Sequence, residues 1–320
     1  MIRWGILGCG DVTEVKSGPA LQKAKRSSVV ACMRRDEAKA KDYAARHNIP
    51  RAYGSADELI HDPDVDAVYI ATPPSSHAEL SIQAMKAGKP VLVEKPMAMN
   101  IAECDAMIEA SNATKQSLIV AYYRRALPRF EKLRDLINTG VIGEPRAVLV
   151  HHLRRLEDSP RQGWKTDPAV GGGGLFVDMQ SHTLDWLEYT FGPATSVSGN
   201  VQYQSDDHPA EDLVSYSLGF ESIVATGFCA YAVGQTDESV TIHGSLGSAK
   251  MSFFSQSLIV LRHGDVRTVH DVRDPCHVHQ PFIERVNAHL LEGAPNPAPP
   301  ESARRTTAII ETLFKTPPTI

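Results

Sequence analysis

The chain is poor in cysteine and has no long apolar run. Its 320 residues include five cysteines, which are widely spaced and never form a Cys-x-x-Cys pair. This pattern argues against a disulfide framework and a structural zinc site, and it favours a cytoplasmic location. No apolar stretch is long enough to span a bilayer, and no basic-then-apolar leader precedes the first apolar segment. We therefore expect no membrane partner.

Positive charge is neither in excess nor clustered. Lys and Arg number 33 against 38 Asp and Glu, which gives a formal net charge of −5. Dispersed basic residues argue against a nucleic-acid partner or an anionic membrane surface. The pairs His151–His152 and His277/His279 lack carboxylates or cysteines at ligand spacing, so no metal site is predicted.

The first 121 residues alternate short apolar segments with stretches of helical spacing. The apolar segments are rich in Val and Ile and lie at 2–7, 29–33, 67–72, 90–94 and 117–121. Between them, 76–87 and 101–112 place apolar residues at helical intervals. The alternation predicts an α/β fold, with an N-terminal Rossmann domain built on a doubly wound parallel sheet. Gly18-Pro19 predicts a kink or a late start in the first helix.

The sequence "GCGDV" at residues 8–12 follows the first predicted strand directly. A strand, a tight glycine turn and a helix N-terminus together present backbone N–H groups to a phosphate. Gly8 and Gly10 fit the pattern G-x-G-x-x-G, whereas Thr13 occupies the third glycine position. An ordinary strand-to-helix turn is the alternative, but the strands that follow favour dinucleotide binding. The predicted cofactor contacts here are Gly8, Cys9, Gly10, Asp11 and Val12.

The end of the second strand bears on which dinucleotide is bound. The sequence there is "ACMRRDEAK", so Arg34 and Arg35 stand where NAD enzymes place a carboxylate. An arginine fork suits the 2′-phosphate of NADP, although Asp36 could still reach a ribose of NAD. We predict that Arg34 and Arg35 bind NADP, with NAD as the alternative.

The second half of the chain contains further strand candidates. In "LVSYSLGF" at 213–220, large apolar residues alternate with small or polar ones, as in a sheet with two unlike faces. Other candidate strands lie at 146–153, 196–204, 222–233, 239–243 and 249–254. An open sheet leaves a face or an edge to cover, which predicts a homodimer or homotetramer.

Two separated motifs carry a family resemblance. The first is "AVYIATPPSSH" at 67–77 followed by "AGKPVLVEKPMAMN" at 87–100, and the second is "GWKTDPAVGGGGLFVDMQSHTLD" at 163–185. They resemble the signatures of the glucose-fructose oxidoreductase, inositol dehydrogenase and MocA (Gfo/Idh/MocA) family over nearly the whole chain. The resemblance implies an NAD(P)-binding Rossmann domain at 1–121. It also implies a substrate-binding and oligomerisation domain at 122–320, with an open, mostly antiparallel sheet.

Three residues are the catalytic candidates. Lys95 follows the fourth strand at the sheet edge where ligands bind, and the resemblance implies that it contacts the nicotinamide ribose and relays a proton. Asp178 and His182 are four residues apart and share one face if their segment is helical. The resemblance makes His182 the general acid or base and gives Asp178 an orienting role. The alternative is an ordinary helix carboxylate and a half-buried histidine, but the Gly171–Gly174 run, which lets backbone approach a ligand closely, favours catalysis.

The resemblance implies a further set of cofactor contacts, which are Thr72, Pro73, His77, Glu94, Trp164, Lys165 and His279. The predicted function is an NADP-dependent oxidoreductase that moves a hydride between nicotinamide and a secondary alcohol or ketone. The predicted substrate is a small carbohydrate-like molecule, namely a sugar or a cyclic polyol. The alternatives are a redox-cycling glycosidase with tightly held NAD and a non-catalytic NADP-binding sensor. Retention of all three catalytic candidates argues against the sensor.

Overall fold

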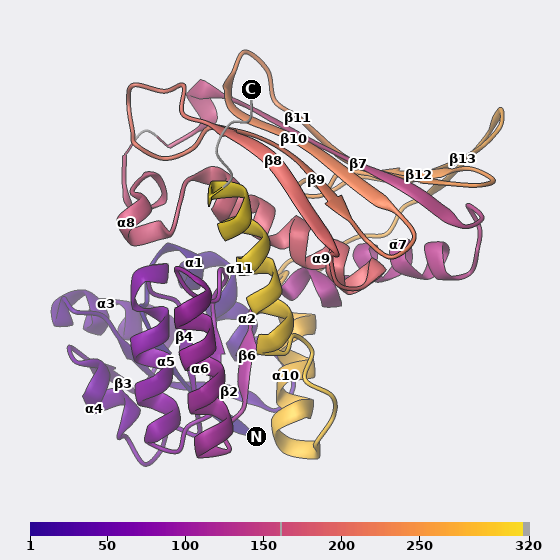
Figure 1. Cartoon of the computed structure of the whole chain (residues 1–320). Helices are drawn as coiled ribbons and strands as arrows, with labels where there is room; N and C mark the ends of the chain where they lie inside the picture. The colour runs from indigo at the N-terminus through magenta and orange to yellow at the C-terminus, as the bar shows by residue number, and fades with distance from the viewer. Residues whose placement is uncertain (161, 316–320) are drawn as a thin grey trace. The chain divides into compact units, whose positions relative to one another are not determined.

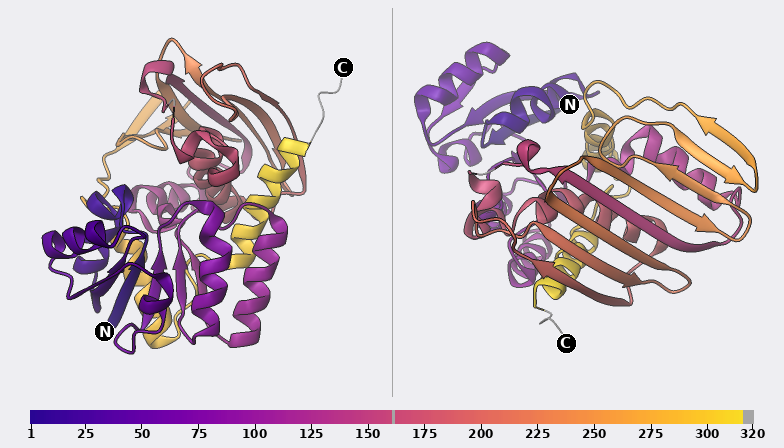
Figure 2. Two further views of the ribbon diagram at one scale, coloured as in Figure 1. Left: turned by 90° about the vertical axis from the view of Figure 1, so that its left-hand side faces the viewer. Right: turned by 90° about the horizontal axis from the view of Figure 1, so that it is seen from above.

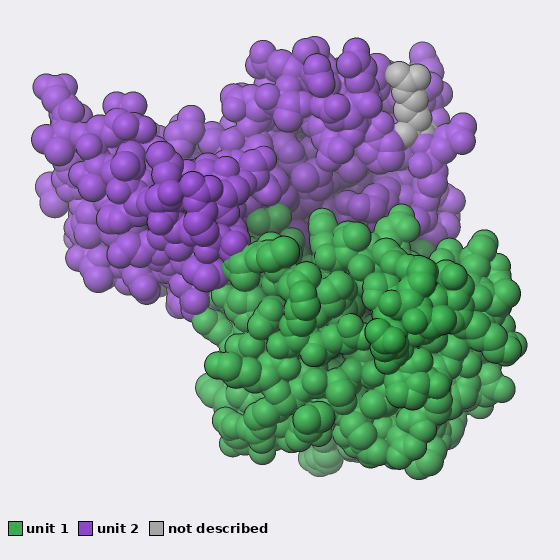
Figure 3. Space-filling model, turned by 180° about the vertical axis from the view of Figure 1, so that it is seen from behind, with its two compact units in different colours: residues 1–127, 275–304 green, residues 128–274, 305–320 purple. Residues whose placement is uncertain are grey.

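The computed structural model describes residues 1–160 and 162–315. Contacts divide the chain into two compact units (Figure 3): the first holds Met1–Leu127 and Pro275–Arg304, and the second holds 128–274 and the residues from Arg305 onward. The predicted single boundary between residues 121 and 122 lies shortly before the end of the first segment. The return of 275–304 to the first unit was not foreseen, because an amphipathic helix does not show in sequence which sheet it covers.

The first unit contains six strands and seven α-helices among its described residues. The strands are β1(Ile2–Leu7), β2(Ser27–Met33), β3(Arg51–Tyr53), β4(Ala67–Ile70), β5(Val91–Val93) and β6(Leu118–Val120). The helices are α1(Asp11–Val15), α2(Ser17–Lys23), α3(Glu37–His47), α4(Ala56–Ile60), α5(His77–Lys86), α6(Ile101–Thr114) and α10(Gln280–Glu292).

The six strands form a parallel sheet in the order β3-β2-β1-β4-β5-β6. Helices α5 and α6 pack side by side on one face (Figure 1). The central strands are buried on both faces, which is why they read as continuous apolar runs. The order reverses between β1 and β4, and doubly wound sheets bind ligands beyond the carboxyl ends of such strands. The predicted fold is confirmed.

Two local features differ from the sequence prediction. Strand β3 was missed because it has three half-buried residues and no apolar run. The first helix divides at Lys16 into α1 and α2, and Gly18 and Pro19 lie in the first turn of α2, where proline removes no helical hydrogen bond. A side chain at Gly18 would collide with the Thr13 carbonyl oxygen, so glycine is needed where the two helices meet.

The second unit is built on eight strands among its described residues. They are β7(Pro145–Arg155), β8(Ser196–Gln202), β9(Leu213–Gly219), β10(Val224–Val233), β11(Asp237–Gly244), β12(Ser248–Met251), β13(Ile259–His263) and β14(Val266–His270). The helices are α7(Pro128–Asn138), α8(Pro168–Gly171), a π-helix at Phe176–Gln180 and α9(Ser181–Phe191). Helix α11(Pro300–Lys315) crosses the division between the units.

This sheet runs β14-β13-β12-β11-β7-β10-β9-β8, and every pair except β7 with β10 is antiparallel. Helices α7 and α9 lie on one face, and no described helix covers the other (Figures 1 and 2). Ala225 and Cys229 on β10 are accordingly buried, whereas Val224 and Phe228 are exposed. The predicted open, mostly antiparallel sheet is confirmed. Strands β13 and β14 were missed, and β14 is exposed along most of its length.

Candidate active site

Gly8 and Gly10 serve different purposes in the loop after β1. Gly8 has a φ of +91°, and an added Cβ would lie 2.8 Å from the backbone nitrogen of Thr72. Glycine is therefore required for the loop to pack against the segment after β4. An added Cβ at Gly10 would meet nothing within 4 Å. The packing of the protein does not demand glycine there, and the space at Gly10 is open.

Most amides of this loop are already bonded within the protein. The N–H groups of Gly8 and Cys9 both donate to the Met33 carbonyl, at 3.0 and 3.1 Å. The N–H of Gly10 donates to Thr13 Oγ1 at 2.9 Å. Gly8, Cys9 and Gly10, which are predicted cofactor contacts, therefore shape the loop, and their amides donate to acceptors within the protein.

Asp11 and Val12 begin α1, and the first amides of a helix have no acceptor within it. Thr13, which replaces the third glycine of the pattern, is fully buried, and its hydroxyl donates to the Gly10 carbonyl at 2.8 Å. The Tyr43 hydroxyl donates to the Thr13 carbonyl at 2.9 Å. Threonine thus closes the loop with side-chain hydrogen bonds and leaves the amides of Asp11 and Val12 for an anion.

The segment after β2 carries the two predicted arginines. Arg34 and Arg35 are both exposed, and Arg34 Nη1 lies 3.5 Å from the Cys9 carbonyl oxygen. Asp36 caps α3 by accepting the Lys39 amide at 3.2 Å, and Lys39 Nζ lies 3.3 Å from its other oxygen. These hydrogen bonds hold the pKa of Asp36 below its usual value. Its carboxylate is thus engaged by its own helix.

His77 joins the loops that follow β4 and β5. It is buried, with Nε2 2.8 Å from the Thr72 carbonyl oxygen and Nδ1 2.9 Å from that of Pro96. Burial lowers the pKa of His77, which favours the neutral ring. Thr72 and Pro73 are half-buried on the loop itself. The structure therefore places His77 as a link between the two loops, where both of its nitrogens face protein carbonyls.

Lys95 stands beside a buried carboxylate. Glu94 Oε1 accepts the Tyr69 hydroxyl at 2.6 Å and lies 3.3 Å from His279 Nε2, while Oε2 accepts the Lys95 amide at 3.2 Å. The Tyr123 ring packs against the His279 ring at a tilt of 32°, with centroids 4.0 Å apart. Burial alone would raise the pKa of Glu94, but the bonds from His279 and Tyr69 outweigh it and lower the pKa. Glu94 and His279, predicted as cofactor contacts, thus lie in a buried network that holds the Lys95 backbone.

The second unit carries Asp178 and His182 on one helical segment. Asp178 lies in the π-helix and His182, which is buried, in the first turn of α9. The predicted helical context is therefore present, and short π-helices are common at functional sites. Lys165 Nζ is 2.9 Å from Asp178 Oδ2 and 5.4 Å from the Trp164 ring centroid. Lys165 thus links Trp164 to Asp178 within this unit.

The glycine run is explained by packing inside the second unit. An added Cβ at Gly171 would lie 2.6 Å from the Trp164 carbonyl oxygen. Gly172 ends α8 with a φ of +79°. At Gly174 it would lie 2.7 Å from the Glu211 carbonyl oxygen and 3.1 Å from Glu211 Oε2. The expectation that these glycines let backbone approach the cofactor is therefore not needed to explain them.

Glu211 is a buried carboxylate next to the segment that carries Asp178, and the sequence did not reveal this contact. It is 2% exposed, and its carboxylate accepts the amides of Gly174 at 2.6 Å and Val177 at 3.2 Å. Burial raises the pKa of Glu211 to about 7, against the opposing effect of these amides. No local signal marks it, because its partners are more than thirty residues away in sequence.

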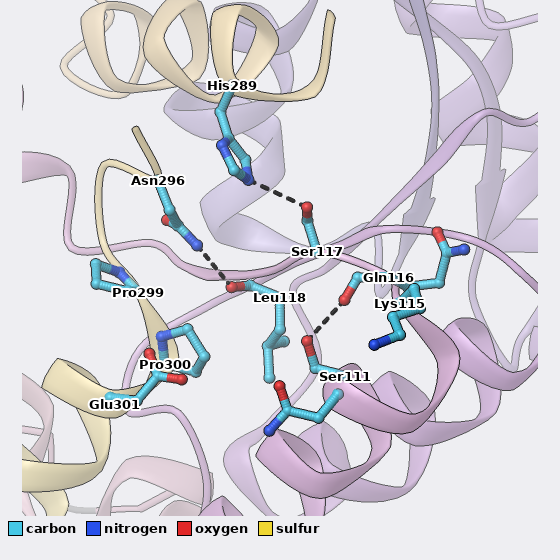
Figure 4. A pocket seen from close by; sticks show the side chains of 11 residues that line it. Ser111, Lys115, Gln116, Ser117, Leu118, His289, Asn296, Pro299, Pro300 and Glu301 are labelled. Atoms are coloured by element: carbon cyan, nitrogen blue, oxygen red, sulfur yellow. Dashed lines mark hydrogen bonds between the residues drawn. The ribbon is translucent and has the colours of Figure 1, made fainter. Parts of the chain in front are cut away.

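A groove of about 680 Å³ lies elsewhere on the first unit, between the end of α6 and the returning chain (Figure 4). His289 Nε2 is 3.1 Å from Ser117 Oγ, and its Nδ1 is 2.7 Å from the Ala294 carbonyl oxygen. The Asn296 amide donates to the Leu118 carbonyl at 3.0 Å. Ser117 precedes β6, so the groove lies at the opposite sheet edge from the glycine loop. Its polar groups fasten the returning chain to the sheet.

Within 1–160 and 162–315, no three His, Cys, Asp or Glu side chains gather as metal ligands would. No helix in these ranges has the length and apolar character needed to cross a membrane.

Comparison with known proteins identifies the family. Residues 2–122 match the model described as oxidoreductase family, NAD-binding Rossmann fold, and residues 130–250 match the GFO/IDH/MocA C-terminal domain. The chain therefore belongs to the Gfo/Idh/MocA oxidoreductases, which confirms the resemblance carried by the motifs. Family membership makes it an NAD(P)-dependent enzyme of the dehydrogenase and reductase class.

Three relatives and one solved structure illustrate the similarity. The chain is 34% identical to oxidoreductase P35 of Formosa agariphila, over 98% of this chain and 99% of the relative. It is 31% identical to trans-1,2-dihydrobenzene-1,2-diol dehydrogenase of Bos taurus (78% and 74%) and to 1,5-anhydro-D-fructose reductase of Ensifer adhaerens (78% and 75%). The structure of aldose-aldose oxidoreductase from Caulobacter crescentus superposes with a TM-score of 0.89 at 24% identity, covering 98% and 96%.

Proposed function

We propose that this protein transfers a hydride between NADP and a secondary alcohol or ketone of a sugar-like or cyclic polyol substrate. The observation that carries the proposal is Lys95, which is half-buried after β5 and whose backbone amide donates to the buried Glu94 carboxylate. The Glu94 carboxylate accepts the Lys95 backbone amide and contacts Tyr69 and His279, so the backbone at Lys95 is anchored to this buried cluster. Two relatives, named for a cyclic diol and an anhydro-sugar, support the substrate class.

The residues of the first unit fit a dinucleotide. The first amides of α1, at Asp11 and Val12, can bond to a phosphate, and the open space at Gly10 admits one. Thr72 and Pro73 form the neighbouring loop across the switch point. When bound, the nicotinamide supplies or accepts the hydride at its C4 atom.

The proton chemistry falls to three side chains. Lys95 holds or relays a proton at the substrate oxygen, and His182 acts as general acid or base. Asp178 orients the reacting hydroxyl and is itself held by Lys165 at 2.9 Å. Trp164 lies against the same lysine and contributes apolar surface beside it.

The first test follows nicotinamide absorbance as purified protein meets NADPH or NADH with ketoses, dicarbonyl sugars and inosose-like rings. Turnover with NADPH in one substrate group is the expected result. The proposal would be contradicted if the protein binds the dinucleotide but nicotinamide absorbance stays unchanged with every substrate of the panel. The same holds for the corresponding alcohols tested with NADP⁺. Non-exchangeable NAD copurifying with the protein would instead point to a redox-cycling glycosidase.

The proposed preference for NADP rests on the segment after β2. Arg34 and Arg35 present two exposed guanidinium groups, while the Asp36 carboxylate is engaged as the α3 cap. Guanidinium groups bind a 2′-phosphate, whereas NAD recognition requires a free carboxylate at the ribose. The guanidinium groups of Arg34 and Arg35 can therefore bind the 2′-phosphate of NADP. The Asp36 carboxylate is engaged at the start of α3 and is poorly placed to bind the ribose of NAD.

Two matched variants test this preference. We expect Arg35→Ala to raise KM for NADPH by about 10- to 100-fold with little effect on NADH, because a charge-assisted phosphate contact is lost. Asp36→Asn keeps a good helix cap but removes the charge, so NADPH kinetics should stay unchanged. Steady-state kinetics with both cofactors measure this. A large rise in KM for NADH in Asp36→Asn, with Arg35→Ala unaffected, would reverse the assignment.

We also propose that the uncovered face of the eight-stranded sheet joins copies of this chain. Leu149 on β7 and Val224 and Phe228 on β10 are 50%, 48% and 46% exposed, and strand pairing places them on the same face. Contiguous apolar residues on a sheet face are typical of an interface. Sedimentation equilibrium should give a dimer or tetramer, which Phe228→Glu should weaken. A monomeric wild-type protein at micromolar concentration contradicts the proposal.

A cytoplasmic location stays a prediction.

A further inference from the structure

We propose that Glu211 positions the catalytic helix: its ionised carboxylate caps the segment carrying Asp178 and His182, and its protonation releases one of the two capping bonds. The inference rests on the proposed function, because it assigns catalytic roles to Asp178 and His182. Glu211 touches no substrate in this account. It acts through the backbone of the helix that it caps.

The geometry is that of a helix cap supplied from a distant part of the chain. The helical segment that starts at Phe176, with Leu175 as its N-cap residue, has no side-chain cap of its own. The first amides of a helix need outside acceptors, and a carboxylate is favoured there by the helix dipole. Glu211 Oε2 accepts the Gly174 amide at 2.6 Å and Oε1 accepts the Val177 amide at 3.2 Å. Val177 immediately precedes Asp178, so the second bond fixes the backbone next to the catalytic carboxylate.

The glycines give independent support. A Cβ at Gly173 would lie 3.2 Å from Glu211 Oε2, and one at Gly174 would lie 3.1 Å from the same atom. A Cβ at Gly173 would also collide with the Val177 side chain. Two successive residues without side chains thus let the chain wrap closely around this carboxylate. Such packing is expected where a buried anion is held by backbone amides.

The charge state of Glu211 changes within the neutral range. Burial raises its pKa to about 7, and hydrogen bonds from its own backbone amide and from those of Gly174, Val177 and Phe176 oppose the rise. The negative charge of Glu211 contributes to the raised pKa values of the Tyr203 and Tyr231 hydroxyls. Both hydroxyls are neutral at pH 7. Asp212, the next residue, turns its carboxylate to the amides of Gln204 and Ser205.

Protonation has a defined structural consequence. A proton on one carboxylate oxygen makes that oxygen an O–H donor and removes the negative charge, so the group becomes a much weaker acceptor of N–H groups. We expect the longer of the two hydrogen bonds, from the Val177 amide to Glu211 Oε1, to break. The turn before Asp178 therefore loosens as pH falls through about 7. Asp178 and Lys165 would then lose their fixed placement, and catalysis would fall while cofactor binding by the first unit is retained.

Hydrogen exchange tests this directly on the full-length protein. Peptides covering 173–180 are followed by mass spectrometry between pH 6 and 8.5, with rates corrected for intrinsic exchange. In the wild-type protein, protection there should fall at least fivefold from pH 8 to pH 6, whereas Glu211→Gln should lack this pH dependence. The matched control is Asp212→Asn, which alters a neighbouring buried carboxylate and should leave the 173–180 response intact. Flat wild-type protection overturns the inference without need of any variant.

Kinetics provide the second arm and separate the two proposals. Glu211→Gln should lower kcat at pH 8 by at least tenfold, with KM for NADPH within twofold of the wild-type value. An unchanged kcat in a folded Glu211→Gln protein overturns the positioning role. If the exchange response is present but the wild-type protein turns over no substrate, the proposed function fails and with it the catalytic meaning of the cap.

Discussion

Replacing Lys95 by alanine is expected to lower kcat by about 10²- to 10⁴-fold, the range typical of losing a general acid or base. The side chain is half-buried after β5, and its backbone amide is bonded to Glu94. Because the network of Glu94, Tyr69 and His279 does not depend on the lysine side chain for its bonds to one another, the fold should persist. Stopped-flow and steady-state rates at saturating cofactor measure the effect.

The control for this prediction is Lys86→Ala. Lys86 is exposed at the end of α5, so its loss removes a positive charge without touching the predicted site. We expect its kcat to equal that of the wild-type protein. A Lys95→Ala enzyme that retains kcat within threefold of the wild-type value, with the same unfolding midpoint, would remove Lys95 from the mechanism.

The sequence was most informative where one residue pattern determines one element. Continuous runs such as 67–70 and 91–93 are buried on both faces of a parallel sheet, so composition alone marks them. β3 and β14 were invisible because edge strands are short or exposed and carry no apolar signal. Their pairing is decided by the neighbouring strand and cannot be read from their own residues.

The sequence predicts which segments form the candidate site, and the structure adds which protein groups their side chains contact. The motif that contains Lys95 also contains Glu94, and both were grouped as ligand contacts. The structure buries Glu94, His77 and His279, where Glu94 and His77 contact protein groups through hydrogen bonds and His279 Nε2 lies 3.3 Å from Glu94 Oε1. A sequence motif does not distinguish a residue that contacts a ligand from an adjacent residue that supports it, because the two occur together in the same motif.

Glu211 shows the second limit of sequence reasoning. Its folded-state pKa of about 7 lies above the value of 4.5 for an ordinary glutamate. Between pH 4.5 and about pH 7, Glu211 binds a proton more readily in the folded protein than in the unfolded chain. The free energy of unfolding therefore falls as pH rises through this range, by about 3 kcal/mol in total for this group. Ionisation is therefore costly to the fold but supplies the cap. A residue that destabilises the protein at working pH is a sign of function, and it emerges only from burial and distance.

Breaking the buried ion pair of Arg129 and Asp274 should destabilise the second unit strongly. The Arg129 side chain is 2% exposed and that of Asp274 is 11% exposed, with Nη2 3.2 Å and Nε 3.3 Å from Oδ2. Arg129 lies at the start of α7, and Asp274 is the last residue before the chain leaves this unit. Asp274→Asn leaves a buried guanidinium without its counter-charge, which costs about 3–5 kcal/mol.

Urea unfolding followed by tryptophan fluorescence measures this loss, since Trp186 packs against Phe130, the residue after Arg129. Arg146→Gln breaks an exposed pair, with side chains 64% and 78% accessible, and should leave the midpoint unchanged. The double variant Arg129→Met with Asp274→Leu removes both buried charges and should recover more than half of the loss. An Asp274→Asn protein within about 1 kcal/mol of the wild-type protein would contradict the assignment, because it would mean that the guanidinium finds adequate compensation elsewhere.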